Sequence, residues 1–93
     1  MKLRKDLIEF TEAMEAELKL NDYKVSWKEQ DIEFLERRLV GEVGEYFEER
    51  AKGETMPESD IGLRKEIIDV ANFCMMIWDK LSEADRQERG GAK

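Results

Sequence analysis

The chain contains no histidine, one cysteine and one proline. The absence of histidine excludes His-based acid/base chemistry and a HExxH zinc site, and no GxxxxGK[ST] phosphate loop is present. Any chemistry must therefore use carboxylates and amines. The one cysteine, Cys74, cannot form an internal disulfide, and its place in the apolar stretch "NFCMMIW" predicts a reduced, buried thiol, as is typical of cytoplasmic proteins.

Long apolar runs are also missing. No segment approaches the roughly 20 apolar residues that a bilayer span needs, and "MKLRKDLIEF" lacks the apolar region of a signal peptide. We therefore expect a cytoplasmic protein with no membrane partner.

Length and charge narrow the possibilities further. A chain of 93 residues suffices for one small domain, which we take as 1–93. Acidic residues outnumber basic ones, 23 to 16, and the net charge of -7 repels the phosphate backbones of nucleic acids. Since no basic block offsets this charge, a nucleic acid polymer is not expected as a partner.

The residues that are abundant favour helices. Glu, Lys, Leu, Met and Ala dominate, and no stretch sustains the period-2 alternation of a half-buried strand. The sequence predicts an all-α fold with three long helices. Their expected ranges are 2–20, 26–52 and 61–81.

Local signals set these boundaries. "SWKE" is a capping box that predicts a helix start at Ser26, and "KGETMPESD" predicts a turn, with Ser59 or Asp60 as the next cap. "SEAD", from Ser82, predicts a short final turn, and residues 86–93 are expected to form a flexible tail. The third helix is apolar on nearly all sides, so we expect an antiparallel bundle completed by oligomerisation.

Two pairs of carboxylates interrupt the apolar faces. At 100° per residue, Glu42 lies at the border of the apolar stripe of its helix, with Glu45 about 60° further round. Glu66 falls between apolar positions of the third helix, and Asp69 lies about 60° from it. Each helix is therefore predicted to present an ExxE or ExxD pair toward the interior.

Burying several carboxylates together requires a positive partner. Lys65 or Arg64 could neutralise part of the charge, but a hard divalent cation accepts several carboxylate oxygens at once. Oxygen-only ligands favour Mg²⁺ or Mn²⁺ over zinc. The alternative is chance, because Glu-rich helices carry ExxE without binding metal.

"EVGE" at 42–45 and "EIID" at 66–69 together resemble the ExxE…ExxD motif of the all-alpha NTP pyrophosphohydrolases, the MazG-like superfamily. The flanking stretches "NDYKVSW" and "DVANFCMMIWDK" are also similar, so the resemblance covers about residues 18–81. It implies hydrolysis of a nucleoside triphosphate between the α and β phosphates. It also implies a homodimer or homotetramer and matches Glu42, Glu45, Glu66 and Asp69 to four catalytic magnesium ligands.

Four further residues are candidates for substrate contact, each with a structural alternative. Asn72 is expected either to donate a hydrogen bond to sugar or phosphate or to be a satisfied interior amide. Lys24 and Lys65 could meet phosphate or remain solvated. Trp27 could stack on a base or anchor the helix start.

A different class of function fits the same sequence. In a non-catalytic helical oligomerisation or binding module, Asp69 and Asn72 would only set helix register, and magnesium would leave the melting temperature unchanged. The acidic charge also fits a decoy for a basic partner. Base and sugar preference, the number of metal ions and the identity of the general base stay open at this stage.

Overall fold

The computed structural model of the protein describes residues 1–21, 26–52 and 57–91. They form α1 (Lys5–Leu20), the short 3-10 helix η1 (Trp27–Glu29), α2 (Ile32–Ala51) and α3 (Pro57–Gly91). No strand occurs in these three ranges, which confirms the all-α prediction. Lys24 and the turn residues 53–56 lie outside the described residues.

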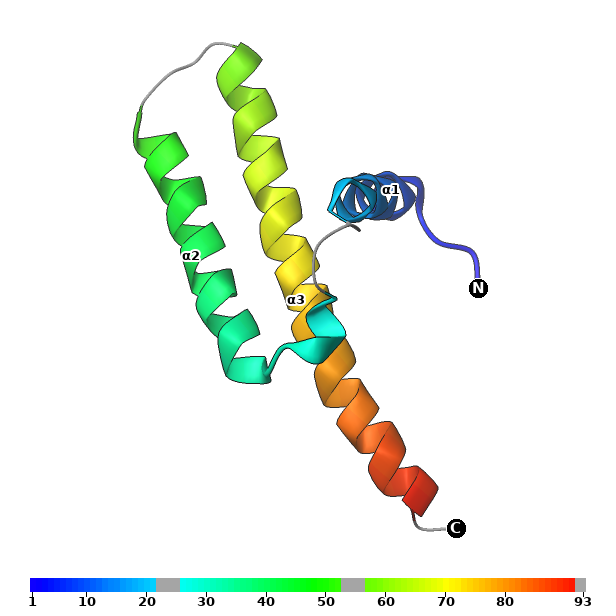
Figure 1. Ribbon diagram of the computed structural model, residues 1–93. Helices are drawn as coiled ribbons and strands as arrows, with labels where there is room; N and C mark the ends of the chain where they lie inside the picture. The colour runs from blue at the N-terminus through cyan, green and yellow to red at the C-terminus, as the bar shows by residue number, and fades with distance from the viewer. Residues whose placement is uncertain (22–25, 53–56, 92–93) are drawn as a thin grey trace.

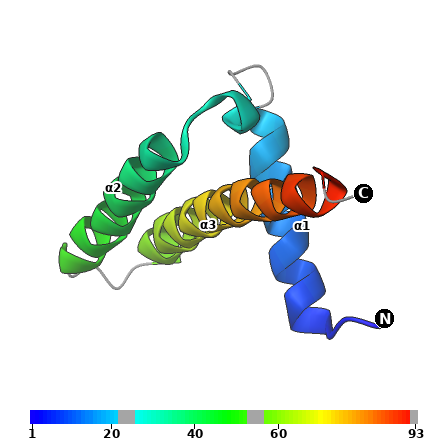
Figure 2. The same ribbon diagram turned by 90° about the horizontal axis from the view of Figure 1, so that it is seen from below.

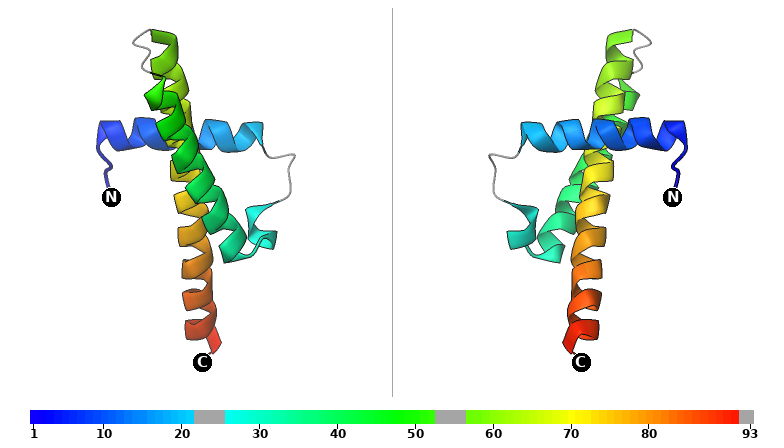
Figure 3. Two further views of the ribbon diagram at one scale, coloured as in Figure 1. Left: turned by 90° about the vertical axis from the view of Figure 1, so that its left-hand side faces the viewer. Right: turned by 90° about the vertical axis from the view of Figure 1, so that its right-hand side faces the viewer.

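α2 and α3 form an antiparallel hairpin, and α3 lies between α2 and α1 (Figure 1). α1 does not run alongside the other two helices but crosses α3 (Figures 2 and 3). The predicted antiparallel arrangement of all three helices is therefore wrong for α1. The crossing brings the backbone of α1 to the side chain of Asn72, whose Nδ2 donates to the carbonyl oxygen of Met14 at 3.3 Å.

The helix starts differ from the predicted ones. α1 begins at Lys5 and α2 at Ile32. Ser26 caps η1 instead of α2, because its Oγ accepts from the backbone N–H of Lys28 at 3.2 Å. The cap of α2 is Asp31, whose Oδ1 accepts from the N–H of Phe34 at 2.8 Å.

α3 is longer than predicted at both ends. It begins at Pro57, a residue suited to the first helical turn, so Ser59 and Asp60 lie inside the helix and do not precede it. It continues through Ser82 to Gly91, which makes the predicted separate turn wrong and places 86–91 of the predicted tail in the helix. The reason is that 82–89 contains only residues a helix tolerates, with no Gly or Pro to break it.

The apolar core is small. Of the residues that the structure describes, Leu35 is the one buried apolar side chain, at 1% exposure, whereas Glu42 and Asn72 are buried polar groups. Phe47 and Trp78 are 62% and 66% exposed, and Cys74 is exposed, contrary to the prediction of a buried thiol. Among the described elements, α2 packs on α3, and α3 packs on α2, α1 and η1, so the outer faces of α2 and α3 that carry these residues lack cover.

η1 is fixed to the middle of α3 by polar contacts. Trp27 Nε1 donates to Asp79 Oδ2 at 3.4 Å, and Lys80 Nζ donates to the carbonyl oxygen of Lys28 at 3.0 Å. Arg86, about two turns further along α3, places Nη2 3.6 Å from Asp79 Oδ1. None of the described helices combines the length and apolar character needed to cross a membrane.

Candidate metal and nucleotide site

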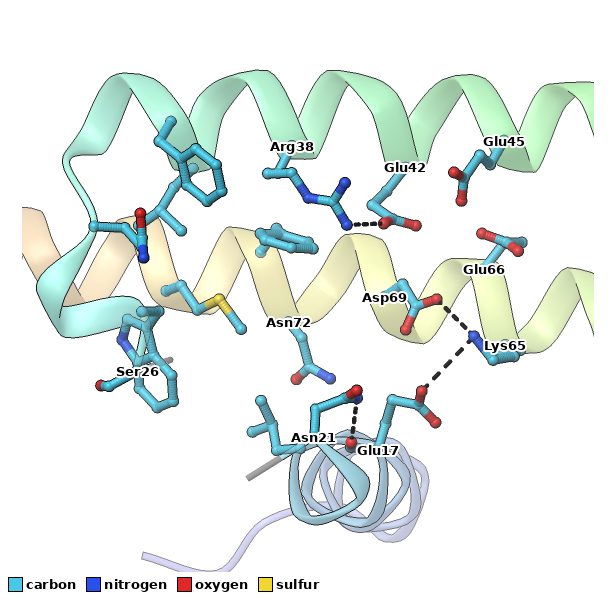
Figure 4. Close-up of a pocket in the computed structure, with 17 residues that line it drawn as sticks. Glu17, Asn21, Ser26, Arg38, Glu42, Glu45, Lys65, Glu66, Asp69 and Asn72 are labelled. Carbon is cyan, nitrogen blue, oxygen red and sulfur yellow. Dashed lines mark hydrogen bonds and ion pairs between the residues drawn. The ribbon is translucent and has the colours of Figure 1, made fainter. Parts of the chain in front are cut away.

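An open cleft of about 720 Å³ lies where α2, α3, α1 and η1 meet (Figure 4). Carboxylates gather at one end of it, on α2 and α3. The other end, toward η1, contains the apolar side chains of Trp27, Phe34 and Met76 together with the polar Ser26 and Gln30. A cleft of this size is within the range of small-ligand sites, and its two ends differ in chemistry.

The carboxylate end brings together three of the four predicted ligands. Glu42 and Glu45 project from successive turns of α2, and Glu66 projects toward them from α3 (Figure 4). One oxygen of each lies within 4.8 Å of the other two. The antiparallel pairing of α2 with α3 thus places carboxylates from two helices at one point.

Glu42 is the most buried member of this group, which we call the carboxylate cluster (Glu42, Glu45 and Glu66). It is 7% exposed, and its Oε2 is buried without a hydrogen-bond partner. Burial raises the pKa of Glu42 to about 7, helped by the adjacent carboxyl group of Glu45 and the charge of Asp69, while Arg38 opposes the shift. The charge of Arg38 therefore does not offset the combined effect of burial and the neighbouring carboxylates.

Glu66 shows the same condition to a lesser degree. Its Oε2 is also buried without a hydrogen-bond partner. Burial raises the pKa of Glu66, and the charges of Glu45 and Asp69 raise it further, while Lys65 lowers it. Two helices therefore each contribute one buried, unpaired carboxylate oxygen to the cluster.

Asp69 lies beside the cluster but is paired elsewhere. Its Oδ2 accepts from Lys65 Nζ at 3.0 Å, and the same Nζ lies 3.7 Å from Glu17 Oε1 on α1 (Figure 4). The hydrogen bond to Asp69 raises the pKa of Lys65, against the effect of burial. Lys65 is therefore part of the charge network of the cleft, as the sequence allowed, but its ammonium group faces carboxylates.

Asn72 lines the cleft and is only 4% exposed. Its Nδ2 donates to Met14 of α1, whereas its Oδ1 has no hydrogen-bond partner. The expected donor is thus engaged by the protein backbone. The group without a partner is an acceptor, which suits a hydroxyl or amino group of a ligand.

The contacts of Trp27 favour the hypothesis that it anchors a helix over the hypothesis that it stacks on a base. Its indole N–H is engaged by Asp79, and its ring is half-buried at the apolar end of the cleft. This contact fixes η1 to α3. A planar ligand group entering the cleft would still meet Trp27 and Phe34 there.

Arg38 and Glu17 also line the cleft, and neither is predicted as a site residue from the sequence. Arg38 Nη2 lies 3.3 Å from Glu42 Oε1, and its guanidinium lies 5.5 Å from the centre of the Phe73 ring. The spacing of four residues from Arg38 to Glu42 is enough to predict an ion pair along one face of α2. The contact with Phe73 joins two helices and could not be read from spacing within one.

The donor set fits a hard divalent cation. It consists of carboxylate oxygens alone, as Mg²⁺ and Mn²⁺ prefer, and two of those oxygens are buried without partners. A cation bound by the cluster would compensate the charge that burial makes unfavourable. Acidic groups on a fully solvated surface would not show this combination.

Comparison with known proteins finds similarity to a chain of archaeal origin. The protein is 36% identical over 59 residues to an uncharacterized protein of Archaeoglobus fulgidus. The match covers 63% of this chain and 62% of the other, so the chain spans less than two thirds of its relative's length. No family model and no solved structure matches the chain.

Proposed function

We propose that the protein is a Mg²⁺-dependent nucleoside triphosphate pyrophosphohydrolase. It would cleave an NTP or dNTP between the α and β phosphates and release the monophosphate and pyrophosphate. The observation that carries the proposal is the carboxylate cluster, in which buried, unpaired oxygens of α2 and α3 converge at the end of a cleft. The resemblance to the all-alpha, MazG-like pyrophosphohydrolases supplies the reaction.

Glu42, Glu45 and Glu66 would hold the metal, and Mn²⁺ would serve in place of Mg²⁺. A bound ion would supply charge compensation for the triphosphate and would lower the pKa of the attacking water. Asp69 is adjacent to the cluster without belonging to it, and because its Oδ2 accepts from Lys65, Oδ1 would be the oxygen offered to the metal or to the proton of that water. Lys65 holds Asp69 in this place by their 3.0 Å contact.

The remaining lining of the cleft suits a nucleoside. Apolar and aromatic side chains gather at the end away from the carboxylates, where Trp27, Phe34 and Met76 offer surfaces for a base. Asn72 Oδ1 is an unpaired acceptor beside them. A nucleotide would thus lie along the cleft with its phosphates toward the carboxylate cluster.

The proposal includes self-association into a homodimer or homotetramer. It is supported by the small core and by large apolar side chains left exposed on the outer surfaces of α2 and α3, such as Val40, Phe47, Trp78 and Leu81. Covering such residues with a second copy would stabilise a chain of this size. Light scattering coupled to size-exclusion chromatography tests this part, and a monomer at micromolar concentration would contradict it.

The activity is tested by incubating the protein with a panel of ribo- and deoxyribonucleoside triphosphates, with Mg²⁺ or with a chelator. We expect pyrophosphate, and not orthophosphate, to appear only with the metal. Absence of pyrophosphate across the panel, together with no thermal shift on adding Mg²⁺, would favour the non-catalytic binding module.

A further inference from the structure

Arg38 lies between the two chemically different ends of the cleft. It projects from α2 one turn before Glu42 and toward α3 (Figure 4). At the carboxylate end, Glu42 Oε1 accepts a hydrogen bond from Arg38 Nη2 at 3.3 Å. Phe73, on α3, lies under its guanidinium at 5.5 Å. Arg38 therefore occupies the point where the phosphates and the nucleoside of a bound nucleotide would meet.

These contacts orient the guanidinium without burying it. The Arg38 side chain remains 53% exposed, whereas that of Glu42 is 8% exposed. A guanidinium carries five N–H donors, and the ion pair with Glu42 uses Nη2. Its planar group stacks on an aromatic face and can also pair with phosphate oxygens, a combination that lysine does not offer.

The ion pair competes with a metal. Glu42 is one of the three carboxylates of the cluster, so Arg38 and a divalent cation are positive groups that both lie close to it. Their mutual repulsion makes binding of a metal alone less favourable. When metal and nucleotide bind together, the phosphates supply the negative charge that accommodates both cations.

We infer that Arg38 is a phosphate-binding residue that neutralises Glu42 in the metal-free protein and moves to the nucleotide's phosphate oxygens when metal and nucleotide bind. This inference rests on the proposed function. It makes Arg38 a device that couples metal binding to nucleotide binding. Arg38 weakens the binding of a divalent cation alone, because both compete for Glu42. When the cation arrives with a nucleotide, Arg38 binds the phosphate oxygens and strengthens the complex.

Replacing Arg38 should therefore change two affinities in opposite directions. Arg38→Met keeps an unbranched apolar stem over Phe73 and removes the charge. The affinity for Mn²⁺ alone should rise roughly two- to fivefold, the range of a partly exposed ion pair. The affinity for the magnesium complex of inorganic tripolyphosphate should fall about tenfold, because a charge-assisted contact is lost.

The matched control is Arg37→Met. Arg37 has the same charge and the neighbouring position on α2, but it is exposed and does not line the cleft. Both ligands are titrated by calorimetry at about pH 8.5, above the pKa of Glu42, so that proton competition is small. Circular dichroism establishes that each variant remains helical, and Arg38→Lys separates charge from planar geometry, with an intermediate loss of tripolyphosphate affinity expected.

The inference is overturned if Arg38→Met matches Arg37→Met in tripolyphosphate binding, or if its affinity for Mn²⁺ alone does not rise. Either result leaves the proposed function standing when the wild-type protein still releases pyrophosphate from a triphosphate. A wild-type protein that neither binds Mn²⁺ nor releases pyrophosphate overturns both. Opposite shifts in the two affinities, absent from the Arg37→Met control, support the inference.

Discussion

Asp79 and Glu66 are carboxylates on the same helix, yet their surroundings differ. Asp79 accepts from the Trp27 indole and faces the guanidinium of Arg86. Glu66 meets other carboxylates, and its buried Oε2 has no hydrogen-bond partner. The first arrangement is complete within the protein, as expected of a side chain that fixes an element of the fold. The second is incomplete without a further positive group.

The same contrast separates the two ends of the cleft. At the η1 end, Trp27 and Lys80 make the polar contacts that fix η1 to α3. At the carboxylate end, burial raises the pKa values of Glu42 and Glu66, and the neighbouring carboxylates raise them further. A buried polar group with partners stabilises a fold, whereas one without them identifies where a ligand would be stabilising.

The sharpest test of this contrast is to neutralise Glu66. Glu66→Gln should lower turnover by roughly a thousandfold or more, because a metal ligand supplies several kcal/mol of transition-state stabilisation. The melting temperature without metal should stay equal or rise, since a repulsive charge is removed. Steady-state pyrophosphate release and circular dichroism measure the two effects. Wild-type activity in this variant would remove the cluster as the catalytic site.

Stability of the metal-free protein should depend on pH through Glu42. Because the folded-state pKa, about 7, lies above the ordinary value of 4.5, the contribution of Glu42 is fully present below about pH 4.5 and is lost as the pH rises through 7. The free energy of unfolding should fall by roughly 2–3 kcal/mol across this range. Urea titrations at a series of pH values measure it.

The control for this pH dependence is Glu42→Gln, which should flatten the decline. Mg²⁺ should act in the opposite sense, because the metal binds the ionised carboxylate, so its thermal shift should grow as the pH rises. A shift that is absent, or largest at low pH, would contradict a metal site at the cluster.

Asp79→Asn should lower stability and leave turnover nearly unchanged, the reverse of the effects expected for Glu66→Gln. Weakening the contacts with Trp27 and Arg86 should reduce the free energy of unfolding by about 1 kcal/mol, whereas turnover at a temperature well below melting should stay within about threefold of wild type. Chemical denaturation and the pyrophosphate assay test the pair of expectations. If Asp79→Asn instead abolished turnover at full stability, the assignment of this carboxylate to the fold would be wrong.

The smallest effect is expected at Lys65. Lys65→Met removes ion pairs with Asp69 and Glu17, and its half-exposed ammonium limits the loss of stability to less than about 1 kcal/mol. It also leaves Asp69 free of its partner, so affinity for Mn²⁺ alone should rise. Denaturant midpoints and calorimetry measure both. A loss of several kcal/mol would show that Lys65 is a main support for the crossing of α1 over α3.

Patterns within single helices predicted more than contacts between helices did. The all-α class and the inward placement of Glu42 and Glu66 follow from composition and the 3.6-residue period. The crossing of α1 could not be derived in this way, because it depends on contacts such as that of Asn72 with Met14, 58 residues apart. The predicted caps failed as well. Ser26 and Ser82 each carry a capping sequence, but Ser26 caps only the short η1, and Ser82 lies inside α3.

The site also departs from its motif for tertiary reasons. The ExxE…ExxD spacing treats four carboxylates alike, whereas the structure pairs Asp69 with Lys65 and Glu42 with Arg38. Lys65 additionally reaches Glu17 on α1. Such cross-helix pairs depend on which helix is adjacent, and the sequence alone did not specify that α1 would cross at this point.

The hairpin of α2 and α3 has a consequence for how the chain folds. Glu42, Glu45 and Glu66 all come from one pair of adjacent antiparallel helices, so closing the loop between them costs little conformational entropy and can occur early. Each productive encounter of the two helices, however, brings like charges together. A divalent cation bound at the cluster as proposed would therefore raise the rate at which the hairpin closes as well as the stability of the folded state.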